Sequence, residues 1–386
     1  MILRIVATLI LVCVWCGAQA TQGSEALDRR LLVVDAERVH GHLAAAESML
    51  AELQAALERT EGSGLQLAVA LREHGLLRDD EARPEEAIAF YEHSLAIVRA
   101  RPGAGPVMKA LLLADLAGSH ADSGEGDVAL SLSGEALTLL QGAAERTNPA
   151  YPAVLYAHGV ALHRLGRNAE ALTELREALE LWRQAADPDS PHVALAKEAI
   201  ADCFSDLGYK NLAEAAEREA LAIRASLGTP DSVGVAASLN NLGVILARAQ
   251  RWSDGQQALE RAVAILERFG DCEERRLATA LGNLGALYYE QARLSAAFYA
   301  KAEAAYRRKL AMEEHMFGPS DVRISPTLEM LGEVLYRERA YNEAGRLYSR
   351  GVAIQTSAFG STDPKTQAAA KRYSILAKKM KADAAR

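Results

Sequence analysis

The chain has 386 residues, of which half are apolar and only 5% are aromatic, so it is long enough to bury a large core or an extended, stacked one. A formal net charge of -8 argues against a protein that binds nucleic acid or an anionic membrane through its overall charge. Alanine and leucine dominate, and glycine recurs at regular intervals, which favours helices that pack closely on small residues.

The first twenty residues have the pattern of a cleaved secretory signal peptide. Arg4 gives a short positive start, residues 5–15 are apolar, and Ala18 and Ala20 are small residues at the positions that a signal peptidase inspects. The apolar run is shorter than the ~20 residues of a spanning helix. We therefore expect export by cleavage after Ala20 to a periplasm or the medium, with no membrane span after cleavage.

Residues 21–64 are predicted to form a helical hairpin, which is either a cap or a degenerate leading copy of the repeat described next. Gly62-Ser63-Gly64 marks its end. A step of 42 residues back from Gly75 reaches Val33, and twelve residues further on is Ala45, as the repeat requires.

A repeat occupies residues 65–363 in seven copies, each predicted to be a pair of short helices. A small residue, here called the anchor residue, stands in the middle of each first helix. The anchor residues are Gly75, Ala117, Gly159, Ala201, Gly243, Gly285 and Gly332, with five steps of 42 residues and one of 47. Large residues such as Leu239, Leu242 and Leu246 form one apolar helix face, which no copy can bury alone. The copies must therefore stack into a solenoid.

The links between copies end a helix with glycine or proline and begin the next with an aspartate or serine cap, as in residues 187–193 and 227–233. The five extra residues of the long step are expected between the two helices of copy six, near residues 293–301, where they would lengthen a helix by about a turn. Cys203 falls in a first helix and Cys272 in a link two helices later, which favours two unpaired thiols over a disulfide.

Residues 364–386 are predicted to form a lone, lysine-rich capping helix over the last apolar face. They belong to a basic end of the chain: residues 301–386 carry 16 basic and 10 acidic side chains, whereas residues 21–150 carry 11 and 21. This asymmetry is either a solvated surface that changes sign or a feature that orients contact with a partner.

The repeat resembles the tetratricopeptide repeat, which has a small residue at position 8 and alanines at positions 20 and 27. Its 42-residue period is similar to the longer variant found in kinesin light chains and many bacterial proteins. The resemblance implies an all-α fold, a right-handed α-solenoid of stacked antiparallel helix pairs whose first helices line a concave groove. The resemblance gives no indication of a catalytic activity.

The resemblance also implies that positions 2, 5, 6, 9, 12 and 13 of each first helix face the groove. The residues that we expect to bind a peptide there are Asn240, Asn241, Arg248, Asn283, Tyr289, Glu290, Tyr336, Arg337 and Arg164. Asparagine at position 6, here Asn241 and Asn283, bonds the backbone of an extended peptide in related proteins, because a carboxamide both donates and accepts. The alternative is that these amides bond neighbouring helices or water. Glu73, Asp115, Ala157, Ala199 and Met330 occupy this position in the remaining copies, so the groove is expected to centre on copies five to seven rather than to run the full length of the repeats.

No nucleotide-binding loop, nucleophile elbow or zinc-protease motif is present. His40 and His42 lack a third ligand, and His74, His120 and His158 fall at packing positions of successive first helices, so we expect neither metal nor cofactor. The sequence thus predicts an exported, non-enzymatic scaffold for a protein or peptide partner. The alternatives are a ligand-responsive regulator of the same fold and an accessory subunit of an envelope assembly.

Overall fold

The computed structural model describes residues 29–31, 33–34, 37–38, 43–59, 64–101, 104–142, 148–185, 190–227 and 230–384. These residues form helices joined by turns, with no strand among them. They divide into two compact units, of which the first ends at Ser238 and the second begins at Leu239. The predicted signal peptide, residues 1–20, and the His40 and His42 pair lie outside the described residues.

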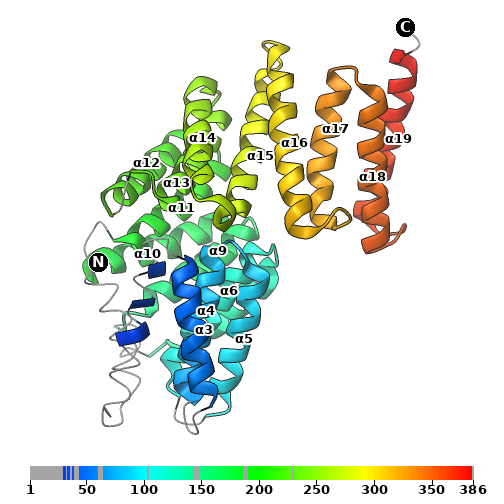
Figure 1. The fold of residues 1–386 in the computed structure, drawn as a ribbon. Helices are drawn as coiled ribbons and strands as arrows, with labels where there is room; N and C mark the ends of the chain where they lie inside the picture. Colours follow the sequence, from blue (N-terminus) through cyan, green and yellow to red (C-terminus); the bar gives the residue numbers. More distant parts are fainter. Residues whose placement is uncertain are drawn as a thin grey trace. The chain divides into compact units, whose positions relative to one another are not determined.

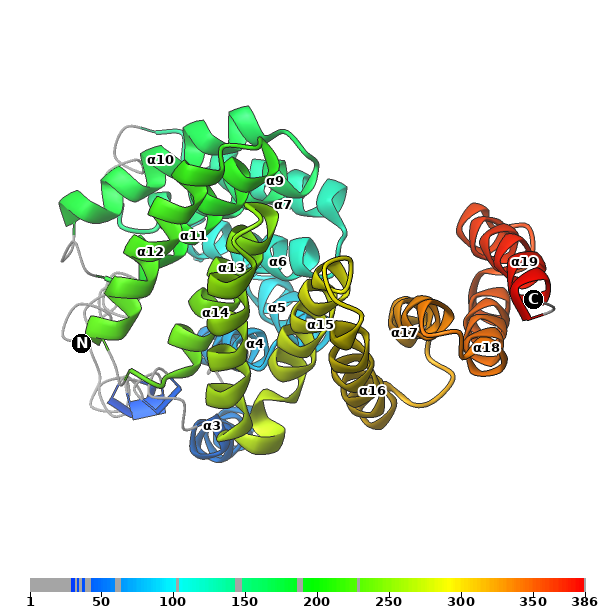
Figure 2. The same ribbon diagram turned by 90° about the horizontal axis from the view of Figure 1, so that it is seen from above.

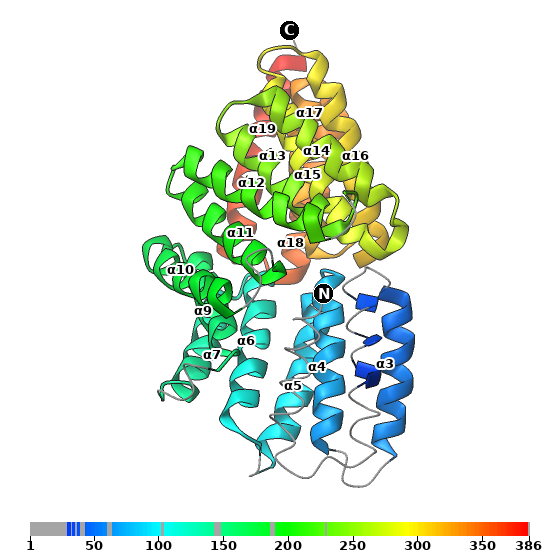
Figure 3. The ribbon, with the colours of Figure 1, turned by 90° about the vertical axis from the view of Figure 1, so that its left-hand side faces the viewer.

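The first unit is a series of helices in which each packs against the next. Figure 3 shows α3 to α6 side by side, and the same order continues along the unit. The helices are α3 (Leu43–Glu58), α4 (Gly64–Asp80), α5 (Pro84–Arg99), α6 (Pro106–Asp122), α7 (Gly126–Leu139), α9 (Tyr151–Arg164), α10 (Asn168–Ala185), α11 (Pro191–Asp206) and α12 (Lys210–Leu227).

Helix α13 (Val233–Arg248) contains the boundary between the units. The second unit continues with α14 (Trp252–Glu267), the short 3-10 helix η1 (Gly270–Glu273), α15 (Glu274–Gln291), α16 (Ala297–Phe317), the 3-10 helix η2 (Val322–Ile324), α17 (Ser325–Arg337), α18 (Tyr341–Phe359) and α19 (Pro364–Ala384). Figures 1 and 2 show α15 to α19 following one another as antiparallel neighbours. No helix in the described part of the chain combines the length and apolarity needed to cross a membrane.

The anchor residues lie where the two helices of a copy come closest. A Cβ atom added to Gly243 of α13 would stand 2.6 Å from Cγ of Leu259 and 3.1 Å from the carbonyl oxygen of Gly255, both on α14. A Cβ on Gly75 of α4 would stand 2.4 Å from the ring of Tyr91 on α5. Larger residues at these positions would overpack the interface. The predicted fold class, a solenoid of stacked helix pairs, is confirmed.

The turn between the two helices of a copy requires a left-handed backbone seven residues after the anchor residue. The residue there has a positive φ in six of the seven copies: Ala82, Gly124, Gly166, Gly208, Gln250 and Arg339. Glycine adopts this conformation without steric cost, whereas the other three residues are held in it by the closure of the turn.

Side-chain caps fix where several first helices begin. The hydroxyl oxygens of Ser190 and Ser232 accept hydrogen bonds from the backbone amides of Val193 and Val235, at 3.4 and 3.3 Å. The two serines are 42 residues apart and occupy the same place in successive copies. The predicted serine caps are therefore confirmed, and each satisfies an amide that the first turn of a helix leaves unbonded.

The five extra residues of copy six do not lengthen a single helix by a turn, as the sequence suggested. Helix α15 ends at Gln291, six residues after its anchor residue, whereas the other first helices end five residues after theirs. The turn from residue 292 to 296 has two residues more than the turn from 249 to 251, and α16 begins two residues earlier relative to Ala302 than α14 does relative to Gly255. The insertion is shared because extending both helices and the turn keeps Tyr306 packed on Gly285.

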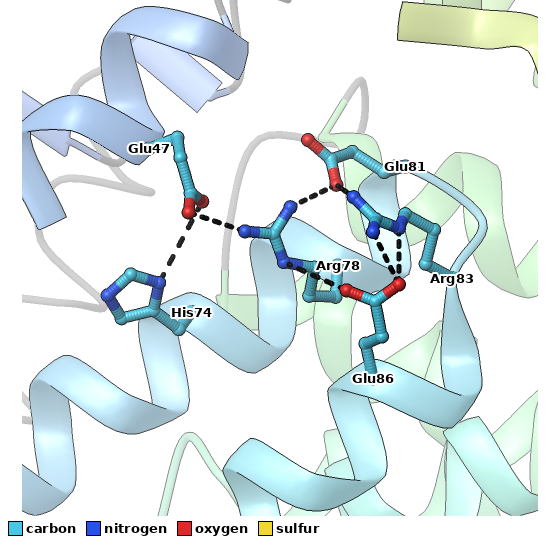
Figure 4. Close-up of polar contacts among 6 residues, drawn as sticks. All are labelled: Glu47, His74, Arg78, Glu81, Arg83 and Glu86. Atoms are coloured by element: carbon cyan, nitrogen blue, oxygen red, sulfur yellow. Dashed lines mark hydrogen bonds and ion pairs between the residues drawn. The ribbon is translucent and has the colours of Figure 1, made fainter. Parts of the chain in front are cut away.

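A buried arginine attaches α3 to the first copy of the repeat. Figure 4 shows Arg78 of α4 between Glu47 of α3, Glu81 of the following turn and Glu86 of α5. Its guanidinium nitrogens lie 2.5 Å from carboxylate oxygens of Glu47 and Glu81, and 3.8 Å from Glu86. Because Arg78 is only 9% exposed, these carboxylates are needed to compensate its desolvation.

Helix α19 packs on the other end of the repeats, against α18. The ring of Tyr373 stacks on that of Tyr348 with centroids 6.1 Å apart, and the guanidinium of Arg372 lies 2.6 Å from a carboxylate oxygen of Glu329 on α17. Its exposed face carries Lys371, Lys378 and Lys379.

Candidate binding surface

Three of the predicted peptide-binding asparagines form a chain of hydrogen bonds in the second unit. The amide nitrogen of Asn283 on α15 donates to the carboxamide oxygen of Asn240 on α13 at 2.9 Å, and the amide of Asn240 donates to Asn241 at 3.4 Å. All three are partly exposed. Asn283 thus bonds a neighbouring first helix, as the alternative expected, and peptide binding by these three residues stays a prediction.

Glu333 of α17 joins a second group of predicted residues. Its carboxylate accepts hydrogen bonds from the hydroxyl of Tyr289 on α15 at 3.0 Å, from Arg337 at 2.8 Å and from the hydroxyl of Tyr348 on α18 at 3.1 Å. Glu333 and Tyr289 therefore connect two successive first helices. Burial raises the pKa of Tyr289, and the negative charge of Glu333 raises it further.

The remaining predicted residues of the second unit lie at the ends of their first helices. Arg248 and Glu290 are exposed, and Glu290 has an oxygen 3.6 Å from a nitrogen of Arg293. The ring of Tyr336 is tilted against Tyr341 with centroids 5.7 Å apart, and the guanidinium of Arg337 lies 6.0 Å from the centre of the Tyr336 ring.

Arg164 lies apart from the other predicted residues, on α9 of the first unit. Its guanidinium is 2.8 Å from a carboxylate oxygen of Asp122, which holds the equivalent place in the preceding copy. Arg337 is likewise bonded to Glu333. Two of the arginines that the sequence predicts to bind a peptide, Arg164 and Arg337, thus already have a carboxylate partner within the chain.

The histidines of successive first helices do not converge. His74 stacks on Phe90 with centroids 4.9 Å apart and has Nδ1 3.9 Å from Glu47 (Figure 4). His120 and His158 each have Nδ1 2.5 Å from a glutamate, Glu125 and Glu174 respectively. In the described ranges no group of three or more histidine, cysteine or acidic side chains is arranged to hold a metal ion.

Cys203 is a buried free thiol. Burial raises its pKa to about 12, with a further contribution from the negative charges of Asp202 and Asp206.

A buried polar cluster on α4 and α6 was not predicted from the sequence. The guanidinium of Arg72 lies 2.6 Å from a carboxylate oxygen of Asp115. Asp79 accepts hydrogen bonds from the hydroxyls of Tyr91 at 2.7 Å and Ser119 at 2.9 Å. Burial raises the pKa of Asp79 to about 7, although these two hydrogen bonds oppose the shift.

A second missed cluster joins α11, α12 and α13 within the first unit. The guanidinium of Arg224 donates to both carboxylate oxygens of Glu198, each at 2.6 Å, and the hydroxyl of Ser238 donates to the same carboxylate at 2.6 Å. Glu217 is fully buried beside them and Asp202 is exposed on α11.

One sequence signal could have found several of these contacts. Their partners are about one repeat apart: 43 residues separate Arg72 from Asp115 and Asn240 from Asn283, and 40 separate Glu198 from Ser238. Pairing polar residues at a spacing close to the repeat period therefore predicts contacts between neighbouring first helices.

The first-helix surface is thus built from polar side chains that bridge neighbouring copies. Residues 151–226 and 234–312, which contain much of both units, match the tetratricopeptide repeat family. A comparison with curated proteins found no significant match.

Similar solved structures share the fold at low sequence identity. A Rap protein complexed with competence and sporulation factor has a TM-score of 0.57 and 16% identity, over 88% of this chain and 89% of that chain. The quorum sensor NprR from B. thuringiensis, in its apo form, has a TM-score of 0.56 and 13% identity, over 87% and 89%. NprR in complex with its cognate peptide NprX has a TM-score of 0.59 and 14% identity, over 88% and 89%. Periodicity, helix pairing and the family match together lead to one conclusion: residues 151–226 and 234–312 are tetratricopeptide repeats, within a chain whose fold is the same throughout the described copies.

Proposed function

We propose that this protein is an exported, non-enzymatic scaffold that binds an extended peptide segment of a partner protein on the first helices of its second unit. One observation carries the proposal. Among the described residues, neither the amide nitrogen of Asn241 nor the carboxamide oxygen of Asn283 has a hydrogen-bond partner, while Asn240 holds the two side chains in one chain. One donor and one acceptor are what a peptide unit needs to have its carbonyl and its amide satisfied.

The similar structures support the same kind of ligand. Rap was solved with competence and sporulation factor and NprR with its cognate peptide NprX, which are statements about those two proteins. Transfer of this property to the present chain is part of the proposal, because their identities to it are 16% and 14%.

Export is the second part of the proposal and rests on residues 1–20 alone. If the signal is cleaved after Ala20, the chain recovered from its native compartment begins at Thr21. Amino-terminal sequencing of that chain gives the answer, and a chain that retains Met1 would contradict export by this route.

The binding experiment starts from the immobilised mature chain and a library of random peptides. We expect selected peptides to bind the chain and to lose about ten-fold in affinity in Asn241→Ala/Asn283→Ala, the size of one or two lost hydrogen bonds. The matched control is Asn211→Ala/Asn342→Ala, because both asparagines are exposed on second helices, α12 and α18. Equal losses in both variants, or no selected peptide at all, would contradict a groove of this kind.

The same peptides separate the scaffold from the ligand-responsive regulator. A regulator must change conformation on binding, because its ligand binds one state more tightly than another. Solution scattering with and without the selected peptide should be unchanged for the scaffold, and a changed scattering profile would favour the regulator.

A further inference from the structure

The residue sixteen positions after each anchor residue packs against it. Where the anchor residue is glycine, this residue is large: Tyr91, Leu175, Leu259 and Tyr348, and Tyr306 in the copy with the insertion. Where the anchor residue is alanine, in copies two and four, the residues are Ser133 and Glu217. Glu217 is thus an ionisable group in a place that the other copies fill with leucine, tyrosine or serine.

Ser133 and Glu217 differ in how their polar atoms are satisfied. The buried hydroxyl of Ser133 donates to the carbonyl oxygen of Ala129 at 2.7 Å. Glu217 is 0% exposed, and neither of its carboxyl oxygens has a hydrogen-bond partner among the described residues. A buried carboxyl group without a hydrogen bond costs folding free energy, and a partner from outside the chain would offset part of that cost.

The side chain at this position points from the second helix to the surface of the first helices. In two other copies its tip reaches first-helix carboxylates, because the hydroxyls of Tyr91 and Tyr348 donate to Asp79 and Glu333. Glu217 likewise interacts electrostatically with Glu198 and Asp202, which are four residues apart on one face of α11.

The cationic group whose charge acts on Glu217 is already engaged. Arg224 of α12 makes its two short hydrogen bonds to Glu198. Asp202 is exposed and makes no hydrogen bond or ion pair with the described residues, although His163 and Arg164 of α9 favour its charged form. Of the three carboxyl groups Glu198, Asp202 and Glu217, only Glu198 makes a hydrogen bond or ion pair with a cationic side chain among the described residues.

We propose that Asp202 and Glu217 form a subsite for a cationic side chain, the guanidinium of an arginine or the ammonium of a lysine, on the α11 surface of the first unit. A cation there would pair with the exposed Asp202 and offset the repulsion between Asp202, Glu198 and Glu217. The subsite goes beyond the proposed function, because it lies on α11 and α12 of the first unit, whereas the proposed peptide-binding asparagines belong to the second unit. It adds a cationic side chain to what a partner protein must present.

Binding at this subsite is coupled to protons. Burial raises the pKa of Glu217 to about 9, and the negative charges of Glu198 and Asp202 contribute to the shift, while the positive charge of Arg224 opposes it. At neutral pH Glu217 therefore holds a proton, and an arriving cation favours its release to solvent. Tyr156 of α9 also faces Glu198 and Arg224, and burial keeps its phenol protonated.

Hexaarginine is the probe, titrated into the full chain by calorimetry at about pH 7 in phosphate and in Tris, which differ in ionisation enthalpy. We expect binding whose heat depends on the buffer because protons are released. Asp202→Asn should weaken binding about ten-fold, the size of one charge-assisted contact. Glu217→Gln should weaken binding and remove most of the buffer dependence.

Two controls separate a specific subsite from general attraction between charges. Glu177→Gln removes one exposed carboxylate from the second helix α10 and should leave hexaarginine binding unchanged. Hexaglutamate should not bind at the subsite. Ala201→Gly/Glu217→Leu reproduces the pairing of Gly243 with Leu259, so it removes the carboxyl group while keeping a helix contact that the chain already uses.

The hexaarginine and peptide-binding results together separate the subsite from the proposed function. Hexaarginine binding that is absent, or that is unchanged in Asp202→Asn and in both Glu217 variants once circular dichroism shows that they are folded, overturns the subsite. Such a result leaves the proposed function standing if library-selected peptides still depend on Asn241 and Asn283. Loss of binding in the Asp202 and Glu217 variants, with no effect of the asparagine variants, supports the subsite and refutes the proposed asparagine groove.

Discussion

Replacement of Gly243 by alanine tests the close packing of the two helices in copy five. The added Cβ would stand 2.6 Å from Cγ of Leu259 and 3.1 Å from the carbonyl oxygen of Gly255, so the helices must separate or Leu259 must leave its rotamer. Overpacking of this kind costs about 1–3 kcal/mol, of which the better helix propensity of alanine returns up to about 1 kcal/mol. We expect Gly243→Ala to lower the free energy of unfolding by roughly 1–2 kcal/mol.

Another copy of the repeat shows which substitution would compensate for the added methyl group. Copy two pairs Ala117 with Ser133, whose hydroxyl bonds the carbonyl four residues earlier. Leu259→Ser alone should cost about 2–5 kcal/mol, because it leaves a cavity against Gly243. In Gly243→Ala/Leu259→Ser the new methyl group occupies part of that cavity. The double variant should therefore be less destabilised than the sum of the single variants by about 1–2 kcal/mol.

Urea unfolding followed by circular dichroism measures the three variants, with hydrogen exchange of α13 and α14 as a local readout, since repeat arrays do not always unfold in one step. The control is Gly118→Ala in the first helix α6, because a Cβ there has no atom within 4 Å. Gly118→Ala should be neutral or slightly stabilising. Single-variant costs that add to within about 0.5 kcal/mol, or a neutral Gly243→Ala, would refute the close contact.

Three further predictions follow from the turns and the buried ionisable groups. In urea unfolding, Gly166→Ala should lower the free energy of unfolding by about 1 kcal/mol, because φ at residue 166 is 72° and alanine is strained there. Gln250→Gly, at φ 62°, should change it by less than about 1 kcal/mol, because relief of the left-handed backbone offsets the entropy that glycine loses on folding. Equal effects of the two variants would contradict this reasoning. The pKa of Glu217 is about 9 in the folded chain and 4.5 in the reference state, so the wild type loses stability as the pH rises between these values. Near pH 7, Glu217→Gln should therefore be more stable than the wild type by roughly 3 kcal/mol. The gain should vanish below about pH 4.5 in thermal melts across pH, and a gain independent of pH would contradict the assignment. Cys203 should resist iodoacetamide at about pH 8 in the folded chain and react in urea, because burial raises the pKa of its thiol to about 12. Mass spectrometry of the peptide that carries Cys203 measures the two reaction rates. Equal rates would contradict the burial of the thiol.

The candidate site was only partly predictable from sequence. Asn240, Asn241 and Asn283 were expected on one surface, but their mutual hydrogen bonds depend on the offset between α13 and α15, which no local pattern encodes. The same limit explains Arg164 and Arg337, which were predicted to bind a peptide but pair with Asp122 and Glu333 of neighbouring turns or helices. The burial of Glu217 was not predicted, because a glutamate within a helix is ordinarily an exposed residue.

The sequence by itself determined the repeat. Anchor residues such as Gly243, serine caps such as Ser190 and the 42-residue period are local features whose steric and hydrogen-bonding demands are the same in every copy, so helix pairing follows from them. Only the tertiary structure decided which polar side chains meet across neighbouring helices, and that the carboxyl group of Glu217 is buried without a hydrogen bond to the described part of the chain. These outcomes depend on the distance and rotation between stacked copies, where a small change in register exchanges a buried contact for an exposed one.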